Sequence, residues 1–304
     1  MNHDMKGLWP ALLHPVSADG TLDTPRAIGH AHRMLSARCD GITLFGTTGE
    51  GPAFTLAERQ GLLEAMLASG IRADQIVVTL TSMVLDDAIA LGRHACERGV
   101  FRHMLMPPFY FNQPRDAGVV EAFSQVIRGI ADARQRLLLY HFPAMSTYGF
   151  SRDAIAELVR RFPQQVAGLK DSSGDLEHAL GLVRAFPTLS ILVGAEPHIA
   201  EVMRAGGAGS INGLSNVAPN LCRRIVDHPE AVSADDQRLM EGILAQMNAR
   251  PDLPFLGVYK TILAEQTSDD TWMHMRAPLI ALNADESAAV RAGYRSLGAL
   301  LKNI

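Results

Sequence analysis

Eight short runs of apolar and β-branched residues alternate along this chain with longer segments of helical periodicity. This alternation is typical of repeated strand–helix units, which build a parallel sheet. Thr55 and Glu58 add the pattern of a capping box at the start of one helical segment. The predicted strands are 7–13, 41–45, 76–81, 103–106, 137–141, 166–170, 190–193 and 208–212, and the predicted helices are 24–38, 55–69, 85–98, 116–131, 151–162, 175–186 and 197–205.

The order of these segments favours a closed barrel over an open doubly wound sheet. No glycine-rich dinucleotide fingerprint opens any of the predicted helices, and the glycine-rich stretch 206–209 precedes a strand, as a turn would. We therefore predict an α/β fold, a (β/α)8 TIM barrel over residues 1–215. Residues 216–304 are predicted to form a C-terminal helical extension that packs on the barrel within the same structural unit.

Composition and charge indicate which binding partners and which cellular compartment to expect for this protein. A chain of 304 residues fits one large domain. Its net charge of −4 comes from interspersed acids and bases, which favours neither a nucleic-acid nor a membrane partner. Cys39, Cys96 and Cys222 lie far apart without a CxxC spacing, and the N-terminus lacks the pattern of a signal peptide. These features predict a protein of the reducing cytoplasm.

Lys170 ends the apolar run 166–170, where a buried strand meets the loop Asp171-Ser172-Ser173-Gly174. In a barrel of this kind, functional groups lie at the carboxyl ends of the strands. Apolar surroundings disfavour a charged amine, and the neutral form can attack a ketone and form a Schiff base. The alternative is that Lys170 only ends its strand and reaches into solvent.

The second predicted strand runs into a loop of small residues, 46–51, that carries the adjacent hydroxyls of Thr47 and Thr48. Glycines permit a tight turn that exposes N–H groups, so the loop can hold a small carboxylate. The alternative is a turn that satisfies only its own backbone. For Glu50, which belongs to the same loop, bracing of the loop is the preferred interpretation over acid–base chemistry.

The fifth predicted strand ends in Tyr140 and His141, and only one of the two can point inward because side chains alternate along a strand. A tyrosine that faces Lys170 from the neighbouring strand can relay protons while a carbinolamine forms and loses water. The alternative is a tyrosine that packs its ring in the core and satisfies its hydroxyl with one hydrogen bond.

Together these residues resemble the dihydrodipicolinate synthase and N-acetylneuraminate lyase superfamily of pyruvate-dependent Schiff-base lyases. The order and spacing of four segments agree with that family, and the resemblance extends from Gly7 to the C-terminal helices. The segments are Gly46-Thr47-Thr48-Gly49-Glu50, Pro107-Pro108-Phe109-Tyr110, Tyr140-His141-Phe142-Pro143 and Gly168-Leu169-Lys170-Asp171-Ser172-Ser173-Gly174.

The resemblance implies a role for individual residues. Lys170 is expected to form the Schiff base and Tyr140 to transfer protons, while Thr47 and Thr48 bind the carboxylate of a 2-oxo acid such as pyruvate. Tyr110 is expected to reach into the site of a neighbouring subunit, which implies a homotetramer built as a dimer of dimers. The pyruvate pocket is expected to be lined also by Gly194 and Ile211. No cofactor and no metal are implied, and the second partner is an aldehyde or a sugar acid.

Two departures from the family pattern bear on the substrate. Met145 stands where dihydrodipicolinate synthases place an arginine that binds the carboxylate of aspartate semialdehyde, and a thioether cannot replace that contact. Ala195-Glu196-Pro197 matches the acidic pattern of sialic acid lyases only in part. The resemblance therefore points to an aldolase or dehydratase of deoxy sugar acids or other 2-oxo acids. Further polar candidates for reading hydroxyls are Glu196, His198, His141 and Ser146.

Two other classes of protein remain as alternatives. His14, His103 and His141 lie on or near predicted strand ends, as the ligands of a metal-dependent barrel enzyme would, although no HxH or HExxH spacing supports this class. A non-catalytic sensor of 2-oxo acids would keep the barrel and the pocket without turnover. The combination of Lys170, Tyr140 and Thr47 argues against it.

Overall fold

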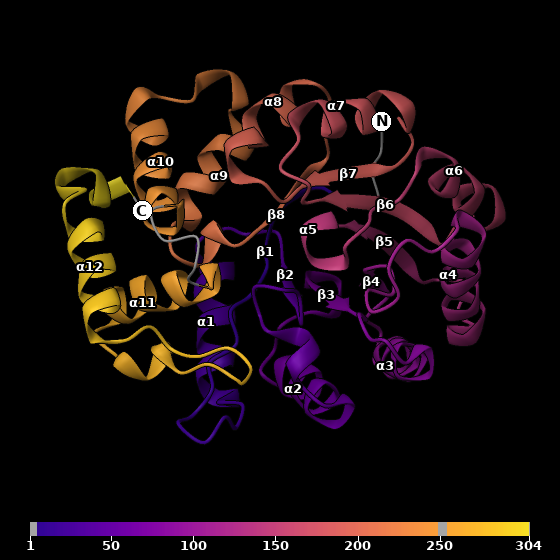
Figure 1. Cartoon of the computed structure of the whole chain (residues 1–304), viewed down its shortest axis with the longest axis horizontal. Coiled ribbons are helices and arrows are strands. Elements are labelled where there is room, and N and C mark those ends of the chain that lie inside the picture. Colours follow the sequence, from indigo (N-terminus) through magenta and orange to yellow (C-terminus); the bar gives the residue numbers. More distant parts are fainter. Residues whose placement is uncertain (1–4, 249–253, 304) are drawn as a thin grey trace.

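The computed structural model describes residues 5–248 and 254–303, and it confirms the predicted TIM barrel (Figure 1). Eight parallel strands pair in the order β1-β8-β7-β6-β5-β4-β3-β2. Between β1 and β2 the barrel closes through a single parallel bridge from Ala11 to Thr43. The strands are β1 (Gly7–Pro10), β2 (Ile42–Leu44), β3 (Ile76–Thr79), β4 (Arg102–Leu105), β5 (Arg136–His141), β6 (Val166–Asp171), β7 (Ser190–Val193) and β8 (Gly209–Asn212).

The first strand is shorter than the predicted 7–13. It ends at Pro10, which lacks the N–H that would continue a ladder. The chain beyond it is held by other bonds: Leu12 donates its N–H to Thr43 O over 3.0 Å, and Leu13 donates to Asn216 Oδ1 over 2.9 Å.

Helices follow the strands as the periodicity predicts. The capping box of Thr55 and Glu58 is formed at the start of the second helix. A short helix after β5, α5 (Pro143–Ser146), was not predicted, because four residues carry no readable period. The others are α1 (Thr24–Ser36), α2 (Leu56–Ala68), α3 (Leu85–Glu97), α4 (Asp116–Ile130), α6 (Arg152–Arg161), α7 (Leu176–Ala185) and α8 (Ile199–Arg204).

After β8 the described chain is mainly helical, as expected. α9 (Pro219–Asp227) contacts β1 and α8 and so takes its place in the ring of helices around the barrel. α10 (Ala234–Asn248), α11 (Phe255–Thr267) and α12 (Ala284–Arg295) gather at one side of the barrel (Figure 1). The division of the chain at residue 215 stays a prediction.

Two buried apolar layers hold the fold together. One fills the space between the strands and the surrounding helices. The other lies inside the barrel, where alternate side chains of the strands meet; it includes Trp9, Met104, Leu138, Tyr140 and Ile211. Within the described residues, no helix is both long enough and apolar enough to cross a lipid bilayer.

Candidate active site

Lys170 lies on β6 near its carboxyl end, between Tyr140 of β5 and Leu192 of β7 in the sheet register. Its side chain is only 4% exposed and lines a cavity of about 280 Å3. The amine makes no hydrogen bond or ion pair with any described residue. The amine lies over the ring of Tyr140, whose centroid is 4.3 Å from Nζ. The alternative of a lysine that reaches into solvent is therefore wrong.

The other lysines of the chain differ from Lys170 in exposure or pairing. Lys6 and Lys302 are exposed. Lys260 is fully buried, but its amine pairs with the Glu50 carboxylate and donates to His274 O over 2.8 Å. Among the described lysines, Lys170 alone combines burial with an unpaired amine.

Tyr140 points into the barrel and His141 points outward, which confirms that only one of the two faces the interior. The Tyr140 hydroxyl lies 3.2 Å from Thr47 Oγ1, within hydrogen-bond distance. Tyr140 thus joins the amine on β6 to the loop after β2. A hydroxyl in this place can pass a proton between a group bound at Lys170 and the Thr47 side chain.

The loop after β2 is a compact turn whose N–H groups at Gly49 and Gly51 both bond to Gly46 O over 3.1 Å. A side chain at Gly51 could not fit, since its Cβ would lie 1.8 Å from Phe45 O. Thr47 and Thr48 both line the cavity of Lys170. Their backbone N–H groups donate to no atom in the described part of the chain, which leaves two donors beside two hydroxyls for a carboxylate.

Glu50 braces this loop, as the sequence indicates. Its carboxylate is buried, pairs with Lys260 of α11, and accepts the Arg276 N–H over 2.8 Å. Burial lowers the pKa of the Lys260 amine, while the charge of Glu50 opposes that shift. Sequence reasoning missed Lys260; the available signal was a lone charge within the apolar run 256–264.

Gly194 and Ile211 both line the cavity of Lys170. A Cβ at Gly194 would lie 2.1 Å from Ser172 Oγ and 3.1 Å from Lys170 Cε, so any side chain there would crowd the amine. Ser172 was missed as a lining residue. The run of small polar residues that follows Lys170 was the signal that could have found it.

Tyr110 lies apart from the other predicted site residues. It is 74% exposed on the loop after β4, where its ring packs edge to face on Phe111, itself 71% exposed. Neither aromatic residue lines the cavity of Lys170. Within one chain, the structure therefore brings together Lys170, Tyr140, Thr47 and Thr48 but not Tyr110.

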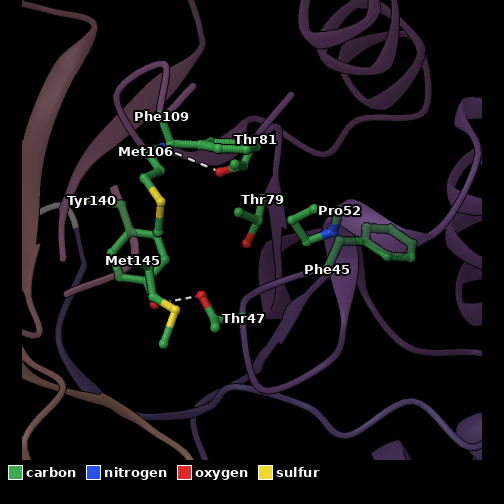
Figure 2. A pocket seen from close by; sticks show the side chains of 9 residues that line it. All are labelled: Phe45, Thr47, Pro52, Thr79, Thr81, Met106, Phe109, Tyr140 and Met145. Carbon is green, nitrogen blue, oxygen red and sulfur yellow. Dashed lines mark hydrogen bonds between the residues drawn. The ribbon is translucent and has the colours of Figure 1, made fainter. Parts of the chain in front are cut away.

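A second hollow of about 190 Å3 adjoins the first at Thr47 and Tyr140. Figure 2 shows Met145 close to Tyr140 and Thr47 on one side of it, and Phe45 and Pro52 on the other. Met145 is 43% exposed and so stands at the entrance. The remaining lining comes from Thr79, Thr81, Met106 and Phe109.

The four polar residues considered for reading hydroxyls each have partners within the protein. One carboxylate oxygen of Glu196 accepts from the N–H groups of Gly213 and Leu214 and from the Tyr259 hydroxyl, over 3.0 to 3.2 Å. His198 bonds to a backbone carbonyl, as does Ser146. Glu196 is the one of the four that also lines the cavity.

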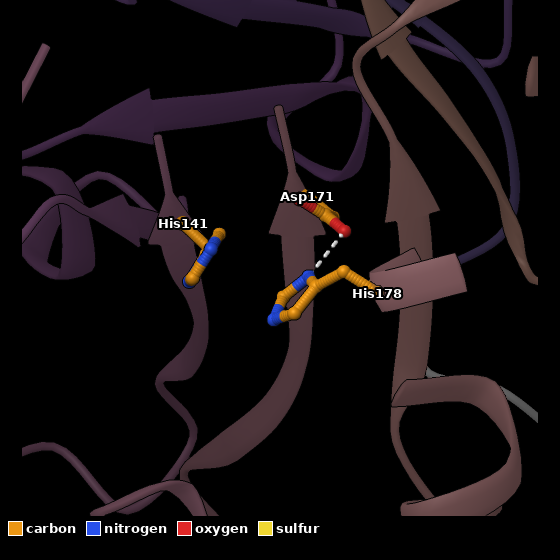
Figure 3. A group of neighbouring side chains, drawn as sticks. All are labelled: His141, Asp171 and His178. Carbon is orange, nitrogen blue, oxygen red and sulfur yellow. Dashed lines mark hydrogen bonds and ion pairs between the residues drawn. The ribbon is translucent and has the colours of Figure 1, made fainter. Parts of the chain in front are cut away.

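His14, His103 and His141 do not form a common site. In the described residues, the one cluster with metal-ligand spacing is His141, Asp171 and His178, on the outer side of β5 and β6 (Figure 3). His141 Nδ1 accepts the Phe150 N–H over 3.1 Å, which leaves the proton of a neutral ring on Nε2. His178 Nδ1 bonds to Asp171 Oδ2 over 2.9 Å. These two bonds engage the cluster within the protein, so we interpret it as a structural support for the end of β6.

Comparison with protein families shows what the whole chain is similar to. Residues 4–295 match the model described as the dihydrodipicolinate synthetase family. A protein of Chloroflexus aurantiacus named as an uncharacterized DapA-like lyase is 34% identical over 297 residues, which cover 96% of this chain and 97% of that protein.

Solved structures give the same result. The crystal structure of dihydrodipicolinate synthase from Agrobacterium tumefaciens is 31% identical, with a TM-score of 0.89 over 96% of this chain and 99% of that one. YagE of Escherichia coli K12, a member of the dihydrodipicolinic acid synthase family solved in complex with pyruvate, is 20% identical. Its TM-score is 0.87 over 96% of this chain and 98% of that one, which shows a shared fold.

Proposed function

We propose that this chain, which belongs to the dihydrodipicolinate synthetase family, is a class I lyase or aldolase that works through a Schiff base on Lys170. Its first substrate is pyruvate or the pyruvyl portion of a larger 2-oxo acid, and its second is an aldehyde or sugar acid. The observation that carries the proposal is the buried, unpaired amine of Lys170 beside the Tyr140 ring. A structural neighbour that shares the fold was solved with pyruvate.

Each step uses a group already in place. The Lys170 amine adds to the C2 carbonyl of the 2-oxo acid and water leaves, which gives an imine. Loss of a C3 proton gives an enamine, whose C3 bonds to the carbonyl carbon of the aldehyde while the aldehyde oxygen takes up a proton. Water then hydrolyses the imine and frees the amine. Run backwards, the same steps cleave the C3–C4 bond of a 4-hydroxy-2-oxo acid.

The other residues have supporting roles in this proposal. Thr47 and Thr48 hold the carboxylate with their hydroxyls and free N–H groups. Tyr140 moves protons to and from the reacting oxygen, with Thr47 as its hydrogen-bond partner. Gly194 keeps space around the amine, and Ile211 forms part of the pocket wall.

Reduction of the imine tests the proposal directly. The protein is incubated with pyruvate and borohydride, and the modified peptide is located by mass spectrometry. We expect one adduct, on Lys170, and none in Lys170→Ala, whose circular dichroism and melting temperature should match those of the wild type. An adduct on Lys260 instead, or none from folded wild-type protein with any 2-oxo acid, would refute the mechanism.

We further propose that Tyr110 acts in the site of a second copy of the chain, within a homotetramer. Two exposed aromatic rings on one loop are costly in water and typical of an interface. Tyr110→Ser should weaken assembly in analytical ultracentrifugation and slow turnover. A wild-type protein that sediments as a monomer with full activity would contradict this assignment.

A second candidate function is dihydrodipicolinate synthesis proper, from pyruvate and aspartate semialdehyde in lysine biosynthesis. The 31% identity to a synthase of known structure favours it. Met145 opposes it, because this residue offers no cation for the carboxylate of aspartate semialdehyde. An assay with aspartate semialdehyde decides between the two.

We place the protein in the cytoplasm. Cys39, Cys96 and Cys222 are all buried and free, an arrangement suited to a reducing compartment. Fractionation of the native cells would test this assignment.

A further inference from the structure

The three hollows that Thr47 lines indicate which kind of second substrate the site can accept. Thr47 lines the cavity of Lys170, the hollow shown in Figure 2, and a third, outer hollow of about 560 Å3. Met145 and Pro52 line both of the latter two. A molecule that approaches the Lys170 enamine through either of these two hollows therefore meets the Met145 and Pro52 side chains.

The outer hollow is largely apolar. It lies between the loop after β2, the start of α11 and the segment 276–279. Its apolar lining consists of Ala53, Pro254, Phe255, Leu256, Ala277, Pro278 and Leu279 in addition to Met145 and Pro52. Burial of apolar surface is favourable in such a space, and aromatic or alkyl groups gain most from it.

Charged groups are few around these hollows, and those present are already engaged. Among the described lining residues they are Lys170, Glu196, Glu50 and Arg276. Lys170 is consumed by the Schiff base in the proposed function. Glu196 accepts three hydrogen bonds on one oxygen, and its negative charge would repel an acidic substrate.

Arg276 is the remaining cation, and its guanidinium makes four hydrogen bonds within the protein. Nε donates to Gly20 O over 3.1 Å and Nη1 to Ala53 O over 2.9 Å, while Nη1 and Nη2 both bond to the Glu58 carboxylate. The group also stacks on Phe54 at 4.5 Å. Glu50 is held by Lys260. No cation of the described lining is left to bind a second carboxylate, and burying one unpaired is costly.

From this arrangement we infer that the second substrate is an aldehyde with an apolar body, aryl or alkyl, and without a carboxylate of its own. The inference rests on the proposed function and narrows its partner. The enamine C3 bonds to the carbonyl carbon of such an aldehyde and the aldehyde oxygen is protonated, while the apolar substituent lies against Met145. Hydrolysis of the imine then releases a 4-hydroxy-2-oxo acid.

A matched pair of aldehydes tests the inference. Benzaldehyde and 4-carboxybenzaldehyde share the ring and differ by one carboxylate; D-glyceraldehyde serves as the polyol. With pyruvate in excess, we expect kcat/KM for benzaldehyde to exceed that for 4-carboxybenzaldehyde by roughly 10- to 200-fold. Equal rates, or a preference for 4-carboxybenzaldehyde or D-glyceraldehyde, would overturn the inference.

Met145→Arg supplies the missing cation and should reverse the preference within the matched pair. Gln164→Arg is its control, because it adds the same charge at an exposed position before β6, at the opposite end of the barrel. It should keep the wild-type preference. A Met145→Arg variant that still prefers benzaldehyde to the wild-type extent would count against the inference.

Borohydride trapping separates failure of the inference from failure of the function. If pyruvate is trapped on Lys170 but the carboxylated or polyol aldehyde reacts better, the Schiff-base function stands and the apolar partner is wrong. If no 2-oxo acid is trapped, both fall together.

Discussion

The ring and the hydroxyl of Tyr140 have different tasks, and a single substitution separates them. The ring packs inside the barrel and lies against the Lys170 amine, whereas the hydroxyl bonds to Thr47. Tyr140→Phe keeps the ring and removes only the oxygen. We expect kcat to fall by about 10²- to 10⁴-fold, the range typical of lost proton transfer, while the protein stays folded. Steady-state kinetics and thermal melting measure both effects.

Tyr294→Phe is the matched control, because it deletes the same atom far from the site. The Tyr294 hydroxyl accepts a hydrogen bond from Gln266 over 2.7 Å within the C-terminal helices. Turnover of this variant should equal that of the wild type. If Tyr140→Phe also turned over at the wild-type rate, Tyr140 would be a packing residue and the proton route would have to lie elsewhere.

At the scale of elements, α11 holds the loop after β2 in place through the Lys260–Glu50 pair. Both side chains are buried, so removal of one partner leaves the other charge without compensation. Lys260→Met should lower the free energy of unfolding by roughly 3–5 kcal/mol. Because the loop carries Thr47 and Thr48, the affinity for pyruvate should fall as well. Urea unfolding and the pyruvate dependence of borohydride trapping give the two values.

Two further variants show whether loss of the Lys260–Glu50 charge pair causes the loss of stability. Lys302→Met makes the same exchange at an exposed position and should leave stability within about 0.5 kcal/mol of the wild type. Glu50→Gln combined with Lys260→Met removes both charges and should recover part of the loss. A double variant less stable than the sum of the single ones would show that the pair is not what braces the loop.

The Lys260–Glu50 ion pair also shows the limit of what the sequence could predict. Lys170 was recognisable because its evidence is local: an apolar run, an amine and a loop of small residues follow one another. Lys260 interrupts an apolar run in the same way, but its partner lies 210 residues earlier in the chain. Only the fold brings the two together. Local spacing therefore predicted the chemical groups, and the tertiary contacts that fix them could not be read from it.

At the scale of the whole molecule, the barrel was predictable because eight predicted strands alternate with seven predicted helices. Apart from one missed short helix, the errors are confined to the ends of elements. β1 ends early at Pro10, and α5 is too short to leave a period. The position of Tyr110 is not an error in the bounds of an element. A single chain leaves this side chain exposed, so its predicted role depends on a second copy that neither the sequence nor one barrel contains.

Buried histidines make the stability of the whole barrel depend on pH. Burial lowers the pKa of His14, His103 and His141 from 6.5 to about 4, and that of His30 to about 3. The native protein keeps these rings neutral, whereas the unfolded chain protonates them below pH 6.5. These rings therefore do not lower the free energy of unfolding above about pH 6.5, and they lower it progressively as the pH falls toward 4.

We expect the free energy of unfolding to fall between pH 6.5 and pH 4.5, by up to about 1.4 kcal/mol per pH unit for each buried ring. Urea unfolding at several pH values measures the slope. His30→Gln should reduce it, because the replacement removes a titrating ring that bonds to Asn216 Oδ1. His32→Gln, at an exposed position two residues on, should not. A flat profile over this range would mean that the rings gain protons without unfolding, and that burial does not hold them neutral.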